Sequence, residues 1–60
     1  MYNKDQWISS FEDHVLRLRP HTSSRLLVTA GLMAWNRYGK QEVPPEQAAA
    51  EWSASMDQAG

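Results

Sequence analysis

The sequence predicts an all-α fold, with residues 1–60 forming one small domain of three helices at about residues 4–19, 23–38 and 45–56. Apolar residues recur at spacings of three and four, which is the period of one helix face. No segment shows the strict alternation of a half-buried strand. Proline stands at both breaks, at Pro20 and at Pro44–Pro45, where it ends one helix or opens the next.

The first predicted helix has clear signals at both ends. Asn3 is a favourable N-cap residue, and Asp5 in the first turn suits the helix dipole. Arg17 and Arg19 lie near the carbonyl end, where the dipole favours cations, and Pro20 stops the helix. One apolar stripe runs along it, made of Trp7, Ile8, Phe11, Val15 and Leu18. This stripe predicts a helix with a single buried face.

The second predicted helix is apolar on nearly every side. Thr22 or Ser23 can cap its start, and Gly39 suits the position after its end because glycine tolerates a positive φ. Its polar residues cluster on one narrow strip, and large or small apolar residues fill most of the remaining circle. A helix of this kind is normally buried, so we expect the central helix to form the core of the domain.

The third predicted helix begins at Pro45, because proline at the first helical position loses no intrahelical hydrogen bond. Glu46 follows in the first turn, where a negative charge is favourable. One face carries Ala48, Ala49, Trp52 and Met56. The last residues, 57–60, are expected to form a frayed tail.

The short chain also predicts self-association. A domain of this size buries only ~60% of the surface that its unfolded chain exposes. The chain contains no Cys, so no disulfide can reinforce it. The outer helices each offer one stripe, which leaves part of the central helix uncovered. We therefore expect a homodimer, and Gly31 marks a close approach, either by the first helix or by a second copy.

Charge is unevenly distributed along the chain. Residues 14–41 carry a net charge of +5 with no acidic residue, whereas residues 1–13 carry -2 and residues 42–60 carry -4. Two interpretations are open. The basic segment binds an anionic partner, or the acidic ends fold back and pair with it.

The sequence carries no signature of catalysis or of a metal or cofactor site. His14 and His21 are the two histidines, and they lack the ligand spacing of a zinc site. The serines form no nucleophile elbow and the glycines no phosphate loop. We therefore expect neither an enzyme nor a bound metal or cofactor.

Nucleic-acid binding is the alternative function. A three-helix chain can contain a helix-turn-helix, but the third helix has no Lys or Arg and carries Glu46, Glu51 and Asp57. Such a helix is repelled by phosphates. The remaining candidate is a basic segment whose side chains could hold a nucleic acid or another anion beside the start of the second helix, namely Arg17, Arg19, His21 and Arg25.

The favoured function is a small regulatory module that binds a protein partner. Trp, Tyr, Met and Arg are enriched in the cores of protein interfaces. The interface candidates form an apolar surface with a basic rim and are Leu32, Trp35, Arg37, Tyr38 and Trp52. With no signal peptide and no apolar run long enough for a membrane span, we expect a soluble cytoplasmic protein that does not bind membranes.

Overall fold

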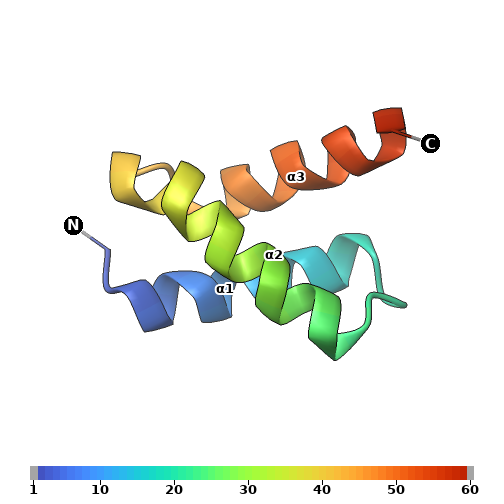
Figure 1. The fold of residues 1–60 in the computed structure, drawn as a ribbon, viewed down its shortest axis with the longest axis horizontal. Helices are drawn as coiled ribbons and strands as arrows, with labels where there is room; N and C mark the ends of the chain where they lie inside the picture. Colours follow the sequence, from blue (N-terminus) through green and yellow to red (C-terminus); the bar gives the residue numbers. More distant parts are fainter. Residues whose placement is uncertain (1, 60) are drawn as a thin grey trace.

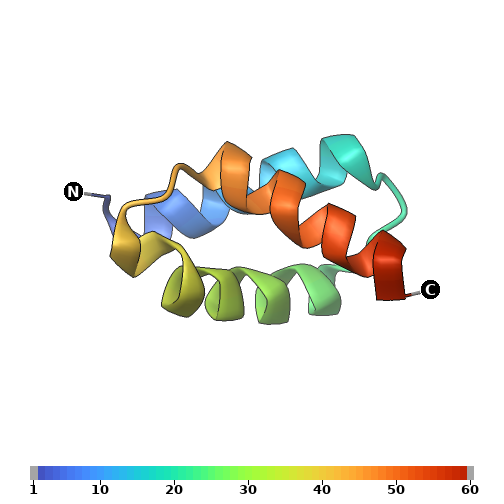
Figure 2. The ribbon, with the colours of Figure 1, turned by 90° about the horizontal axis from the view of Figure 1, so that it is seen from above.

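The computed structural model describes the backbone of residues 2–59 and the side chains of residues 2–57. It contains α1 (Lys4–Leu18), α2 (Ser24–Arg37), a short 3₁₀ helix η1 (Gly39–Gln41) and α3 (Pro45–Ala59). The predicted all-α, three-helix fold is confirmed. α1 and α3 form one layer, and α2 lies across one face of it (Figures 1 and 2). None of the described helices is long and apolar enough to cross a membrane.

Side-chain caps fix the starts of α1 and α2. The side-chain oxygen of Asn3 accepts hydrogen bonds from the backbone N–H groups of Asp5 (2.9 Å) and Gln6 (3.3 Å). At α2 the capping residue is Ser23, whose hydroxyl oxygen accepts from the N–H of Leu26. These bonds satisfy donors that a helix start otherwise leaves unpaired.

The helix at the centre of the core is α1, and this corrects the prediction that α2 is buried all round. Trp7, Phe11 and Val15 are at most 1% exposed, and α1 packs against both other helices. Only one side of α2 meets α1. α3 diverges from α2, so the other sides stay open (Figure 1). The exposed apolar side chains of α2 are Leu26, Val28, Leu32 and Met33.

A row of four aromatic rings crosses the core. Trp7 and Phe11 stack on the buried face of α1, with ring centroids 5.5 Å apart and planes 8° apart. Trp35 of α2 meets Trp7 edge-on at 5.7 Å, and Trp52 of α3 meets Phe11 edge-on at 6.2 Å. Edge-to-face pairs at these distances are favourable. The row joins all three helices, and Trp52 is its outer end.

The two glycines near the centre of the chain serve close packing. A Cβ at Gly31 would lie 2.8 Å from Cγ2 of Ile8, so the neighbour of Gly31 is α1 of the same chain. A Cβ at Gly39 would overlap the six-membered ring of Trp35. The positive φ predicted at Gly39 is wrong, because the left-handed residue of this turn is Glu42 (φ 62°). Gly39 is needed because the chain folds directly over the indole ring of Trp35.

The end of α3 lies further along the chain than predicted. α3 continues to Ala59, three residues past the expected end. Asp57 in this extension accepts two hydrogen bonds from the guanidinium group of Arg19, at 2.7 and 3.1 Å. Gly60 lies outside the described residues, and fraying of residues 57–60 stays a prediction for solution measurements.

Candidate protein-binding groove

Two adjoining hollows share Trp52 in their lining. The first, of about 420 Å³, lies between α2 and α3. The second, of about 400 Å³, lies between the end of α1 with the connection to α2, the start of α2, and α3. The first is lined by Met33, Ala34, Asn36, Arg37, Tyr38, Trp52 and Ser55. The second is lined by Leu18, Arg19, Pro20, His21, Thr22, Leu26, Trp52 and Met56. We call the surface formed by these residues the Trp52 groove. It exists because α2 and α3 both pack on α1 but diverge from each other.

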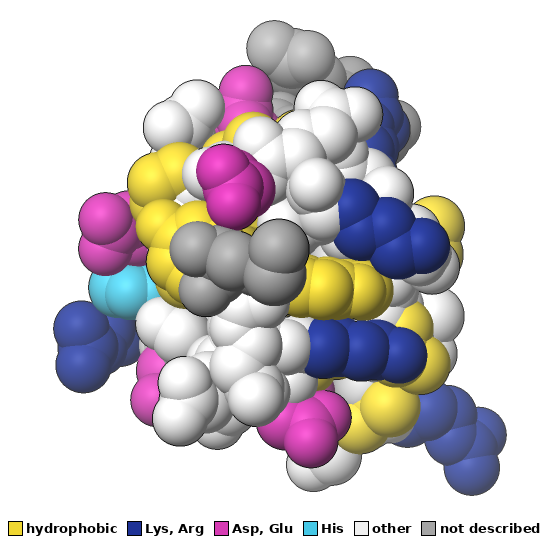
Figure 3. Space-filling model, turned by 90° about the vertical axis from the view of Figure 1, so that its left-hand side faces the viewer, with side chains coloured by type: hydrophobic (Ala, Val, Ile, Leu, Met, Phe, Trp, Pro, Cys, Tyr) yellow, Lys and Arg dark blue, Asp and Glu magenta, His cyan; other side chains and the backbone are white. Residues whose placement is uncertain are grey.

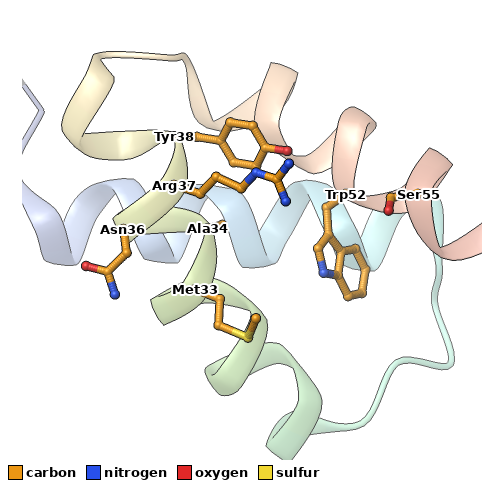
Figure 4. Close-up of a pocket in the computed structure, with 7 residues that line it drawn as sticks. All are labelled: Met33, Ala34, Asn36, Arg37, Tyr38, Trp52 and Ser55. Carbon is orange, nitrogen blue, oxygen red and sulfur yellow. The ribbon is translucent and has the colours of Figure 1, made fainter.

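The groove is mainly apolar and open to solvent. Met33 is 66% exposed and Leu18 54%, and Leu26 and Met56 are also exposed. Figure 4 shows that the indole of Trp52 and the thioether of Met33 extend into the space between the two helices, whereas Asn36 points away from it. Exposed apolar side chains on one concave surface are typical of a site that binds an apolar surface of another molecule.

The charged groups along the groove are basic. Arg37 extends across the first hollow from α2, and its guanidinium carbon lies 5.5 Å from the centroid of the Tyr38 ring (Figure 4). Stacking of this kind holds a guanidinium in place without neutralising it. Among residues 2–57, no carboxylate lies within ion-pair distance of Arg37. Neither hollow is lined by a described Asp or Glu residue.

The structure brings together three of the five predicted interface residues. Arg37, Tyr38 and Trp52 line the first hollow. Trp35 is half-buried, packs edge-on against Trp7 and lines a separate hollow beside Gly39, away from the groove. Leu32 is exposed, but it lines neither hollow of the Trp52 groove.

Sequence reasoning missed the aliphatic part of the groove. The expectation of a buried central helix places Leu26 and Met33 in the core, whereas both are exposed and lie seven residues apart on one side of α2. The apolar face predicted for the third helix includes Met56, which is 41% exposed. The available signal was the helical spacing of Leu26, Met33 and Arg37, which places them on one side of α2.

The predicted anion-binding residues do not form one site. Arg19 is paired with Asp57, and Leu26 N–H at the start of α2 already donates to Ser23. Arg17 is exposed near the end of α1, and Arg25 is exposed in the first turn of α2. His21 lines the second hollow.

The acidic ends of the chain reach its basic middle in two places. Asp57 bonds Arg19, and the carboxylate of Glu46 lies 3.8 Å from Nε2 of His14. These contacts agree with the interpretation that the ends fold back onto the middle. The exposed residues Arg25, Arg37 and Lys40 have no such partner within residues 2–57, so the positive charge on the α2 side remains available.

The first hollow of the groove is lined by one serine, Ser55. Ser55 has no described histidine or carboxylate beside it in the first hollow, so no nucleophile–base pair forms there. Throughout the described part of the chain, no three His, Asp or Glu side chains come close enough together to hold a metal ion. The groove residues can make apolar contacts, stack on aromatic rings and donate hydrogen bonds from the guanidinium of Arg37.

Comparison with known proteins gives no relative from which a role could be transferred. No protein-family model, no curated protein sequence and no solved structure matches this chain.

Proposed function

We propose that this protein is a non-catalytic interaction module that binds a helical segment of a partner protein in the Trp52 groove. The observation that carries the proposal is the open apolar groove between α2 and α3, with Trp52 at the junction of its two hollows. Grooves between helices commonly bind the apolar face of an amphipathic helix. A small module of this kind acts on its partner by occupying that helix, which is the regulatory role we propose.

The side chains along the groove suit such a partner. Trp52, Tyr38 and Arg37 belong to the residue types that contribute most to interface affinity. Met33 and Met56 have flexible, polarisable side chains, which adapt to the shape of an incoming apolar residue. The polar rim contributed by Arg37, Thr22 and Ser55 can satisfy hydrogen-bonding groups at the edge of the interface.

Self-association is a second form of interaction, and another part of α2 favours it. Val28 and Leu32 are 55% and 45% exposed, and neither lines the Trp52 groove. A homodimer that covers these two residues leaves the groove free for the partner. We keep the two contacts as separate proposals because they use different residues.

Capture from native lysate with matched variants tests the proposed function. The baits are the wild-type chain, Met33→Glu in the groove and Val28→Glu on α2 outside it. Both substitutions place one carboxylate at an exposed apolar position of the same helix. We expect the wild type and Val28→Glu to retain the same partner and Met33→Glu to lose it. Equal capture by all three baits would remove the groove as the binding site.

A further inference from the structure

We propose that the occupant of the Trp52 groove is an acidic amphipathic helix of about three turns, held by a carboxylate on Arg37. This inference rests on the proposed function and specifies the chemistry of the partner. Three observations support it, namely the charge of the groove, its length and the shape of the surface around α2.

The first observation is the charge. Residues 24–41, which include α2 and η1, contain Arg25, Arg37 and Lys40 and no acidic residue. In Figure 3 the Lys and Arg side chains project mostly on the side where α2 lies, and most Asp and Glu side chains lie elsewhere on that view. A partner that buries Arg37 has to supply a negative charge, because a buried and unpaired guanidinium is costly.

The guanidinium of Arg37 is already positioned for this contact. It stacks over Tyr38 and reaches across the hollow toward Trp52 (Figure 4). Arginine binds a carboxylate through two parallel N–H donors, and stacking on an aromatic ring leaves these donors free at its edge. Arg19 at the other hollow differs, because it is engaged by Asp57.

The second observation is the length of the groove. The groove residues of α2 run from Leu26 to Arg37, which are eleven residues apart and therefore about 17 Å apart at 1.5 Å per residue. A helix of about 12 residues has this length. Its apolar positions would have to recur at spacings of three or four to meet the Met33, Trp52 and Met56 side chains in turn.

The third observation is a polar strip along α2, which favours a helical partner over a membrane surface as the occupant of the groove. Arg25, Thr29 and Asn36 share one strip of the helix away from its buried face, and all three are exposed. The apolar side chains of the groove lie beside this strip, so a flat lipid surface would contact the polar strip first. A helix that lies in the groove does not contact the polar strip.

A second copy of the chain fits the groove less well than an acidic helix. A symmetric pair joined through the groove would bring two copies of Arg37 into it, and neither hollow is lined by a described Asp or Glu residue that could pair with them. Self-association through the groove is therefore an outcome that the test must detect, and so is binding to anionic lipid.

A peptide selection tests the inference with the full chain as bait. The library displays helical peptides of about 12 residues with Leu or Met fixed at helical spacing, and the other positions are drawn from Glu, Lys and Gln. We expect the selected peptides to be rich in Glu. Arg37→Glu should weaken their binding about tenfold or more. Arg17→Glu is the matched control, because Arg17 is also exposed in the last turn of a helix, and it should leave binding unchanged.

The outcomes separate the inference from the proposed function. Enrichment of neutral or Lys-rich peptides whose binding is lost in Met33→Glu would keep the groove as a site and overturn the acidic partner. Enrichment of no peptide over a bait-free control would overturn both. Glu-rich peptides that bind Arg37→Glu as tightly as the wild type would also overturn the inference.

Two parallel measurements with the same proteins cover the other occupants. A wild-type dimer that becomes monomeric in Met33→Glu would assign the groove to a second copy. Binding to phosphatidylcholine vesicles that contain phosphatidylserine, lost in Met33→Glu, would assign it to lipid. Either result would overturn the acidic helix as occupant.

Discussion

The indole N–H of Trp7 donates a 2.8 Å hydrogen bond to the backbone carbonyl of Val43, thirty-six residues further along the chain. Trp7 is 1% exposed and belongs to the aromatic row of the core. Val43 lies in the connection between η1 and α3. This bond therefore ties the chain just before α3 to the N-terminal part of α1.

Trp7→Phe should destabilise the fold more than the same substitution at Trp52. It removes the donor and leaves the Val43 carbonyl without its partner, which costs about 1–3 kcal/mol, and the smaller ring adds a packing loss. The indole of Trp52 makes no hydrogen bond to residues 2–57, so Trp52→Phe is the matched control. Urea unfolding of both variants measures the difference. Equal losses would show that the Trp7–Val43 bond contributes nothing to stability.

Gly39→Ala should cost more stability than Gly31→Ala. The added Cβ would overlap the six-membered ring of Trp35, which also packs edge-on against Trp7. Overpacking of this kind costs about 1–3 kcal/mol. At Gly31 the nearest atom is a methyl group of half-buried Ile8, which can move, and alanine in a helix gains about 1 kcal/mol over glycine. Thermal unfolding of both variants measures the difference. A larger loss of stability in Gly31→Ala than in Gly39→Ala would contradict this expectation.

Arg19→Gln should loosen the last turn of α3 while changing global stability little. The Arg19–Asp57 pair is exposed, and such pairs contribute about 0–1 kcal/mol. Its removal leaves Asp57 near the carbonyl end of α3, where a negative charge is unfavourable. Amide exchange of residues 57–59 should rise at low salt and differ little from the wild type at about 1 M salt. Arg17→Gln serves as the control, and faster exchange in both variants would exclude a specific role of the pair.

The homodimer is expected to use Val28 and Leu32. Leu32→Lys places a charge on this exposed part of α2 and should convert the sedimenting species from dimer to monomer at micromolar concentration. Met33→Glu should leave the mass unchanged, because Met33 lies in the groove. A wild-type chain that sediments as a monomer would contradict self-association altogether.

The helices could be predicted from the sequence because their signals are local. Asn3, Ser23 and Pro45 mark helix starts through bonds or dihedral angles within a few residues. The identity of the central helix could not be predicted, because it depends on which helix faces pack against each other. α2 has the wider apolar surface, but its contact with α1 uses the small residues Ala30, Gly31 and Ala34.

The sequence predicts only the aromatic and charged residues of the candidate site. Residue type pointed to Arg37, Tyr38 and Trp52, and the structure places all three on one hollow. Residue type also points to Trp35, but that ring is half-buried against Trp7 and Gly39 and lies outside the groove. The exposure of Leu26 and Met33 follows from the divergence of α2 and α3, which no local pattern encodes.

The most direct test of the Trp52 groove is the indole N–H spectrum of the protein by NMR as a Glu-rich helical peptide from the selection is added. The wild-type chain supplies its own control, because Trp7 is buried and bonded to Val43 whereas Trp52 lines both hollows. We predict that the Trp52 indole signal shifts with peptide concentration while the Trp7 signal stays in place. A Trp52 signal that does not move while the peptide binds would contradict the groove as the binding site.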